Sequence, residues 1–101
     1  MAPRDQLELT QVLHALSDPA RLEIVSALAG GGELACGTFA LGVANSTRSH
    51  HLRTLREAGV TATRIAGPRR LVSLRRNDLE ARFPGLLDAV LAAAPRARRS
   101  A

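Results

Sequence analysis

Apolar residues recur at two different spacings along this chain, and the change of spacing divides it into segments. Within residues 5–16 the apolar positions are three or four apart, which predicts an amphipathic helix. Its apolar stripe consists of Leu9, Val12, Leu13 and Leu16. A second helix is predicted over residues 17–29, where Asp18 can cap free amides and Pro19 suits the first helical position. Its inward side chains are Leu22, Val25 and Leu28, and the three glycines at 30–32 end it.

Two more helices are predicted in the next third of the chain. A short one covers residues 34–41 and is broken by Gly42. The following segment, "NSTRSHHLRTLREAG", predicts a fourth helix that is capped by Asn45 or Ser46 and ends at Gly59. Leu52 and Leu55 in this helix lie three positions apart and mark its buried side.

The spacing changes after residue 59. β-Branched residues flank the segment "AGPRR", which predicts a β-hairpin with arginines at its turn. Asn77 is then expected to cap a short helix, Pro84 interrupts the chain, and "GLLDAVLAAA" predicts a last helix. Its aliphatic residues are too many for a free surface helix, and they are Leu86, Leu87, Val90 and Leu91.

The predicted order is therefore α-α-α-α-β-β-α, in which the third and fourth helices form a helix-turn-helix and the hairpin forms a wing. We expect a mainly α winged helix-turn-helix fold. A chain of 101 residues suits one domain, which we place at residues 1–94, followed by a basic flexible tail at 95–101. The stripes of the first and last helices exceed what one small core can use. These two helices are therefore expected to form a homodimer interface through the eight apolar residues named above for them.

Positive charge is concentrated in the middle of the chain. Residues 45–76 contain eight arginines and one acid, Glu57, whereas residues 1–44 contain two arginines and five acids. Such concentration is typical of a surface that binds phosphates. Phe39 and Phe83 are the only aromatic residues, so base stacking on aromatic side chains is largely excluded. The composition therefore favours duplex DNA as the partner.

The fourth helix has the layout that reading a major groove requires. Opposite its buried side it carries small hydrogen-bonding residues and a cation, namely Ser46, Thr47, Ser49, His50 and Arg53. Hydroxyl residues are also common at helix starts simply as caps. The helix-turn-helix order, the arginine hairpin and the local charge together favour DNA binding.

The segments "LHALSDPARLEIVSAL" and "NSTRSHHLRTLREAGV" resemble the ArsR/SmtB-type family of winged-helix repressors, and the resemblance runs from about residue 13 to 74. It implies a homodimer that binds a palindromic operator and releases it when an inducer, not identified by the sequence, binds. It assigns recognition to the five residues of the fourth helix named above. It places Arg64, Arg69 and Arg70 where the wing of the family contacts DNA.

The chain departs from the family pattern at two places. Arg48 stands where an apolar residue is usual, and its guanidinium either reaches a phosphate or lies over the core through its aliphatic stem. We include it among the candidate DNA-binding residues. The wing lacks the tyrosines that are usual in the family and has Leu71, Val72, Ser73 and Leu74 instead.

Neither a metal site nor a cofactor nor a catalytic residue is predicted. Cys36 stands alone where metal-sensing members carry paired cysteines, and the last helix has Asp88 but no histidine. His14 could ligate a metal across a dimer, although a lone histidine is more often simply packed. A single cysteine fits a reducing compartment. With no apolar run near the ~18 residues of a membrane span, we expect a cytoplasmic protein without a membrane partner.

Two alternatives to a simple DNA-binding repressor stay open from the sequence. The protein could respond to oxidation through Cys36, because a helix N-terminus lowers the pKa of a thiol. It could instead be a winged-helix interaction module whose arginine-rich face binds an acidic protein.

Overall fold

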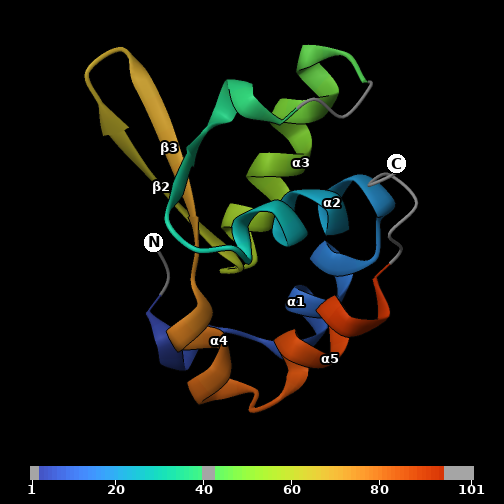
Figure 1. Cartoon of the computed structure of the whole chain (residues 1–101). Helices are drawn as coiled ribbons and strands as arrows, with labels where there is room; N and C mark the ends of the chain where they lie inside the picture. Colours follow the sequence, from blue (N-terminus) through green and yellow to red (C-terminus); the bar gives the residue numbers. More distant parts are fainter. Residues whose placement is uncertain (1–2, 40–42, 95–101) are drawn as a thin grey trace.

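The computed structural model describes residues 3–39 and 43–94, and Figure 1 shows how their elements follow one another. In chain order these are the 3₁₀ turn η1 (Arg4–Gln6), α1 (Leu9–Leu16), α2 (Pro19–Leu28), β1 (Glu33–Ala35), the 3₁₀ turn η2 (Cys36–Thr38), α3 (Asn45–Glu57), β2 (Thr61–Ala66), β3 (Arg69–Leu74), α4 (Arg76–Arg82) and α5 (Leu86–Ala93). The mainly helical winged helix-turn-helix fold predicted from the sequence is confirmed. The predicted tail at 95–101 and the predicted break at Gly42 lie outside the described residues.

The start of α2 forms as its sequence predicts. The Asp18 carboxylate accepts hydrogen bonds from the backbone amides of Ala20, at 2.8 Å, and Arg21, at 3.2 Å. Pro19 occupies the first helical position, where its missing amide proton would have had no partner in the helix. Val25 and Leu28 are buried. The cap thus fixes where α2 begins and which of its faces turns inward.

The α-helix predicted over residues 34–41 is wrong at residues 34–39, which the structure describes, so the α-helix before α3 in the described chain is α2. Residues 33–35 form strand β1, which pairs antiparallel with β3, and residues 36–38 form the turn η2. The sheet has the order β1-β3-β2. Pairing Leu34 with Val72 places the Leu34 side chain against the core, and the strand hydrogen bonds cover an edge of β3 that a hairpin alone would leave open.

Helix α3 ends as predicted but begins differently. Gly59 follows its last turn at φ +85°, a backbone conformation that glycine adopts without strain. At the start, Ala44 is the N-cap residue, so neither Asn45 nor Ser46 caps the helix. Alanine has no side chain that could accept a hydrogen bond from the first amides of α3. Those amides therefore receive no hydrogen bond from the side chain of the N-cap residue.

Strands β2 and β3 form the predicted hairpin, with a turn at Gly67 and Pro68. Directly paired residues share a face of the sheet. The face that we call the inner face carries the buried Thr61 and Val72 and therefore lies toward the core. Its members are Thr61, Thr63, Ile65, Arg70, Val72 and Leu74. The outer face consists of Ala62, Arg64, Ala66, Arg69, Leu71 and Ser73.

The last two helices are separated by Pro84 and Gly85, as predicted. The expected cap at Asn77 is wrong, because α4 begins at Arg76 and its N-cap residue, Arg75, lies two positions before Asn77. The backbone amide of Arg75 donates to the carbonyl of Val60 at 3.0 Å, and its Nε donates to Asp78 at 3.0 Å. These tertiary contacts fix the start of α4 more firmly than the intrinsic preference of asparagine for a cap position.

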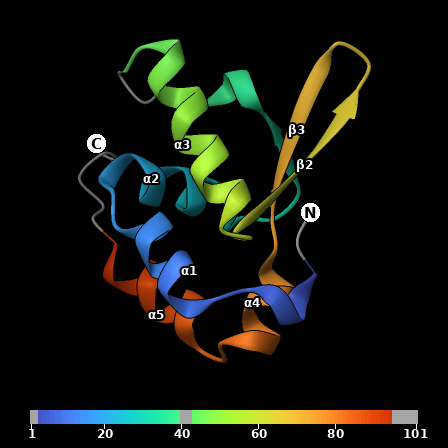
Figure 2. The same ribbon diagram turned by 180° about the vertical axis from the view of Figure 1, so that it is seen from behind.

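Helices α1, α4 and α5 lie at the end of the molecule opposite the hairpin turn and the start of α3 (Figures 1 and 2). Val12, Leu16 and Leu87 belong to the core of the single chain. The prediction that these three residues belong to the dimer interface is therefore wrong, because they are already buried within the single chain. Leu9 and Leu13 are 45% and 43% exposed, and the other predicted interface residues, Leu86, Val90 and Leu91, are half-buried.

Candidate nucleic-acid interface

The outward side of α3 presents the polar residues that the sequence singled out. Ser46, Thr47, Ser49, His50 and Arg53 are all exposed. On the opposite side, Leu55 is completely buried and His51 nearly so. One helix therefore combines a fixed inner side with a polar outer side that includes hydrogen-bond donors, acceptors and a cation. This is the arrangement with which a helix reads base edges in a major groove.

Arg48 occupies an intermediate position at the start of α3. It is half-buried, and its guanidinium reaches the backbone carbonyl of Phe39 at 3.5 Å, the long limit of a hydrogen bond. A half-buried side chain is compatible with both alternatives predicted from the sequence, in which Arg48 either reaches a phosphate or covers the core with its aliphatic stem. Thr54 is the other half-buried polar residue here, and its hydroxyl donates to the His50 carbonyl within the helix at 3.0 Å.

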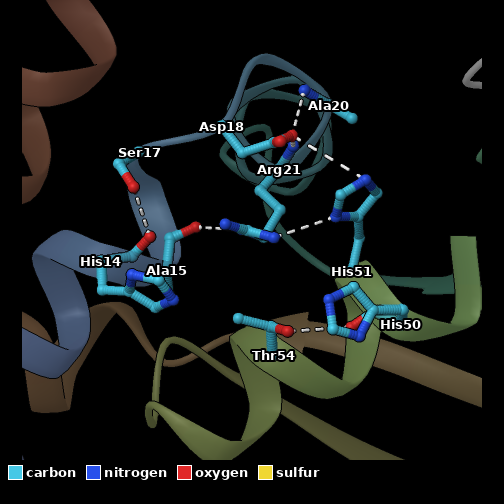
Figure 3. A network of polar contacts seen from close by, with 9 residues as sticks. All are labelled: His14, Ala15, Ser17, Asp18, Ala20, Arg21, His50, His51 and Thr54. Carbon is cyan, nitrogen blue, oxygen red and sulfur yellow. Dashed lines mark hydrogen bonds and ion pairs between the residues drawn. The ribbon is translucent and has the colours of Figure 1, made fainter. Parts of the chain in front are cut away.

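A buried polar network fixes α3 to the two helices before it (Figure 3). Nε of Arg21 donates to the Ala15 carbonyl at 2.7 Å, and its Nη1 lies 3.0 Å from Nδ1 of His51. Because arginine has only donors, Nδ1 of His51 must be the acceptor in this contact. Nε2 of the same imidazole lies 3.9 Å from the Asp18 carboxylate. Arg21 therefore connects the end of α1, the start of α2 and the middle of α3.

Asp18 completes the network with a negative charge. Burial raises the pKa of Asp18, but the amide hydrogen bonds from Arg21 and Ala20, together with the electrostatic influence of the nearby His51 imidazole and Arg21 guanidinium, outweigh it and lower the pKa below its ordinary value. The carboxylate is consequently ionised at neutral pH. It caps α2 and balances the buried guanidinium at the same time.

The three wing arginines differ in their surroundings. Arg64 makes a bidentate ion pair with Glu33 of β1, with Nε–Oε2 at 2.6 Å and Nη2–Oε1 at 2.8 Å. The hydrogen bond from Arg64 lowers the pKa of Glu33, and the Glu33 carboxylate raises the pKa of Arg64. Arg69 and Arg70 are exposed beside the turn. The structure thus brings Arg69 and Arg70 to the tip and connects Arg64 of β2 to Glu33 of β1 across β3.

The start of α3 and the hairpin turn project from the same end of the molecule in both views (Figures 1 and 2). Residues 45–76, which carry eight arginines and one acid, supply both projections. Arg53 of α3, and Arg69 and Arg70 beside the hairpin turn, are exposed cations of this segment. A helix and a basic hairpin directed to one side form a surface that matches a DNA duplex in charge.

Cys36 and His14, the residues considered for redox chemistry and metal binding, lie on different elements of the fold. Cys36 is a free, half-buried thiol at the start of η2, and His14 is exposed on α1. Residues 3–39 and 43–94 contain no group of three or more His, Cys, Asp or Glu side chains placed to hold a metal ion. In the same part of the chain no helix is long and apolar enough to span a membrane.

Sequence reasoning missed Arg21 and His51 as the residues that hold the recognition helix. The signal was present in their spacing. Arg21 precedes the buried Ile24 and Leu28 by three and seven positions, and His51 precedes the buried Leu55 by four. A polar residue on the apolar stripe of a helix needs hydrogen-bond partners inside the protein. The spacing of Arg21 and His51 therefore indicates that both side chains are buried and hydrogen-bonded. Nothing in the sequence pattern joined Arg64 to Glu33, since 31 positions separate them.

Comparison with known proteins supports the class defined by this fold and surface. A family described as a helix-turn-helix domain matches residues 16–64. The HTH-type transcriptional regulator YceK of Bacillus subtilis (strain 168) is 41% identical over 87 residues, which are 83% of this chain and 86% of that protein. The arsenical resistance operon repressor of Staphylococcus xylosus is 34% identical over 74 residues, covering 72% of this chain and 71% of the repressor.

Solved structures agree with this comparison. A homodimeric winged helix-turn-helix DNA-binding domain from Mycobacterium bovis, described as a possible ArsR-family transcriptional regulator, matches with a TM-score of 0.67 and 30% identity, over 83% of this chain and 78% of that one. A possible transcriptional regulator for arsenical resistance matches with a TM-score of 0.64 and 31% identity, over 81% and 84% of the two chains. The fold and its basic surface define a DNA-binding transcriptional regulator. The chain belongs to the ArsR-type family of winged helix-turn-helix regulators.

Proposed function

We propose that this protein is a homodimeric repressor that binds an imperfect palindromic operator and releases it when an inducer binds. The observation that carries the proposal is the two-sided character of α3. Its polar residues from Ser46 to Arg53 face outward, while Leu55 and the Arg21–His51 contact hold the opposite side. Ser46, Thr47, Ser49, His50 and Arg53 would contact bases and phosphates, with Arg48 at the edge of this set. Arg69 and Arg70 of the wing would contact the DNA backbone.

The uncapped start of α3 supports the same proposal. Because Ala44 precedes the helix, no capping side chain occupies its first amides. Free amides and the positive end of a helix dipole favour a phosphate. A DNA backbone crossing this helix start would satisfy the amides that an ordinary cap residue would otherwise take.

The proposal of a dimer rests on the apolar surface at the other end of the molecule. Leu9 and Leu13 are four positions apart on α1, so their exposed side chains share one face. Leu86, Val90 and Leu91 of α5 are half-buried against the core, and part of each stays accessible. A twofold dimer through α1 and α5 would place two recognition helices about 34–36 Å apart, on successive major grooves. The solved relative from Mycobacterium bovis is a homodimer.

Analytical ultracentrifugation tests the dimer. Leu13→Glu would place a charge in the proposed interface and should yield a monomer. Gln11→Glu, at an exposed position on the other side of α1, should leave the dimer intact. A Leu13→Glu protein that sediments as a dimer would rule out an interface through this face of α1.

Members of this family regulate transcription and are normally not enzymes. We therefore propose no catalytic role. A repressor of this kind would act in the cytoplasm, where the chromosome of a bacterium lies. Release of the operator by an inducer is proposed by analogy with the family, without assigning the chemical class of the inducer.

Fluorescence anisotropy tests the proposed DNA binding. A labelled duplex from the region upstream of the gene and a scrambled duplex of the same composition are titrated at low and at physiological salt. We expect salt-sensitive binding with a preference of about 10³-fold or more for the native duplex. Equal and weak binding to both duplexes would contradict a local operator and favour an arginine-rich surface that binds an acidic protein.

A further inference from the structure

We propose that the inner face of the wing, through Ile65 and Arg70, is the side that contacts DNA, and that Arg64 on the outer face braces the wing instead. The inference deepens the proposed function and rests on it. It adds an apolar contact to the interface, and it gives different roles to Arg64 and Arg70, which the sequence had grouped together.

Ile65 is the first observation. Its side chain is 73% exposed, more than that of Leu9, Leu13 or Val43, the other large apolar residues that stand out on the described surface. A single exposed isoleucine in a strand needs no special explanation, since isoleucine favours strands anywhere. The location of Ile65 is what suggests a function, because it lies two residues from the hairpin turn on the basic end of the molecule.

The face on which Ile65 lies is the second observation. Along β2 it follows Thr61 and Thr63 on the inner face, and Thr61 is completely covered by the core. The hairpin extends beyond the core, so this face becomes open at Ile65 while keeping its direction. It therefore continues toward the side of the molecule on which α3 stands (Figure 1). DNA lying on α3 would run along this open end of the inner face.

Arg70 adds a positive charge to the inner face next to Ile65. It is exposed and pairs directly with Ile65 across the hairpin, so the two side chains leave the sheet next to each other on the same face. An apolar group next to a cation matches the backbone of a duplex, where deoxyribose carbons alternate with phosphates. Apolar side chains and arginines together are also the means by which proteins contact a minor groove.

Arg64, unlike Arg70, lies on the outer face and already has a carboxylate partner. It points to the outer face, where both nitrogens of its fork bind the Glu33 carboxylate. Glu33 and Arg64 flank β3 from its two neighbours, β1 and β2, so the ion pair spans the full width of the sheet. A guanidinium that is already occupied by a carboxylate neutralises no phosphate. Its role is to hold β2 against β1 across the outer face of β3.

Anisotropy titrations of the full chain on the upstream and the scrambled duplex, at several salt concentrations, test this division. Ile65→Thr keeps a β-branched residue of similar shape, and we expect affinity for both duplexes to fall about 3- to 10-fold with an unchanged salt slope. Ile65→Val should bind nearly like the natural protein. Arg70→Gln should weaken binding and lower the salt slope by about one phosphate contact.

The matched controls lie on the outer face. Arg69→Gln removes the same charge one residue away and should have a smaller effect than Arg70→Gln. Arg64→Gln and Glu33→Gln should behave alike, with small losses and an unchanged salt slope. A lowered salt slope for Arg64→Gln, or tighter binding by Glu33→Gln, would show that Arg64 contacts phosphate and would overturn the bracing role.

The outcomes also separate this inference from the proposed function. If the natural protein binds DNA and Ile65→Thr binds equally well, the inner-face contact is wrong while the proposed function stands. If the natural protein binds neither duplex at any salt concentration, both are overturned. Circular dichroism and sedimentation of each variant ensure that a loss of affinity reflects a lost contact rather than a lost fold.

Discussion

The recognition helix α3 and the wing carry the candidate DNA contacts, but they are attached to the protein in different ways. Helix α3 is anchored along one side by the buried Leu55 and by the hydrogen bonds that Arg21 makes to His51 and Ala15. The tip of the wing lies beyond the core, and the Arg64–Glu33 pair that connects β2 to β1 is solvent-exposed.

This difference in attachment suits two different tasks. Reading bases requires side chains held within a fraction of an ångström, which buried anchors provide. Contacting a phosphate backbone tolerates more freedom, because charge attraction depends less on orientation. We therefore expect substitutions around α3 to affect stability and specificity, and substitutions in the wing to affect affinity for any duplex. The following predictions test that contrast, beginning with the largest effect.

Arg21→Met should destabilise the protein by about 3 kcal/mol. The change removes the donors to the Ala15 carbonyl and to His51, and both are left without a partner in a buried site. Arg64→Met, which breaks the exposed pair of the wing, should leave the free energy of unfolding nearly unchanged. Urea unfolding followed by circular dichroism, at one fixed protein concentration, measures both. Similar losses for the two variants would contradict the difference in attachment.

Two glycines with positive φ allow the same comparison at the backbone. Gly59, at the end of α3, has φ +85°, and a Cβ there would overlap the Leu7 side chain. Gly67, in the wing turn, has φ +62° with open space around it. Gly67→Ala should therefore cost about 1 kcal/mol from the backbone alone, and Gly59→Ala about 3 kcal/mol because a packing clash is added. Thermal or urea unfolding that ranks the two in reverse order would show that Leu7 can move aside.

Arg53→Ala should reduce the preference for the upstream duplex over the scrambled one by about 10-fold or more, because a base-reading contact is worth roughly 1–3 kcal/mol. Arg56→Ala is the matched control, since Arg56 is an exposed arginine in the last turn of the same helix. It should weaken binding to both duplexes to the same small extent. Competition anisotropy gives the two ratios. An equal loss on both duplexes for Arg53→Ala would assign Arg53 to a phosphate instead.

The smallest effect concerns the dependence of stability on pH at the anchor of α3. The pKa of Asp18 is lowered in the folded protein. Its stabilising contribution is therefore complete at pH values above the ordinary pKa of an aspartate, about 4, and is lost as the pH falls through the lowered value. Asp18→Asn keeps the cap but does not titrate.

The stability advantage of the natural protein over Asp18→Asn should accordingly shrink as the pH is lowered from about 6 to about 3. Urea unfolding across this range gives the difference directly. A difference that stays constant with pH would mean that the charge on Asp18 adds nothing to its role as a cap.

Local signals in the sequence determined much of this protein. Asp18 and Pro19 start α2, Gly59 ends α3, and the β-branched residues around Gly67 and Pro68 form the hairpin, as predicted. Each of these outcomes depends on residues within a few positions of one another, where backbone conformation and hydrogen-bonding preference decide. The outward residues of α3 were predictable for the same reason, since they follow from the period of one helix.

The tertiary structure decided what depends on partners distant in the sequence. Residues 33–35 have no strong preference of their own, and pairing with β3 makes them a strand. Arg21 becomes a buried anchor because His51 and Ala15 meet it, and Arg64 leaves the set of free wing cations because Glu33 lies within reach. Charge and period show which residues are polar or basic. Which of them remain available to DNA depends on whether the folded chain supplies another partner first.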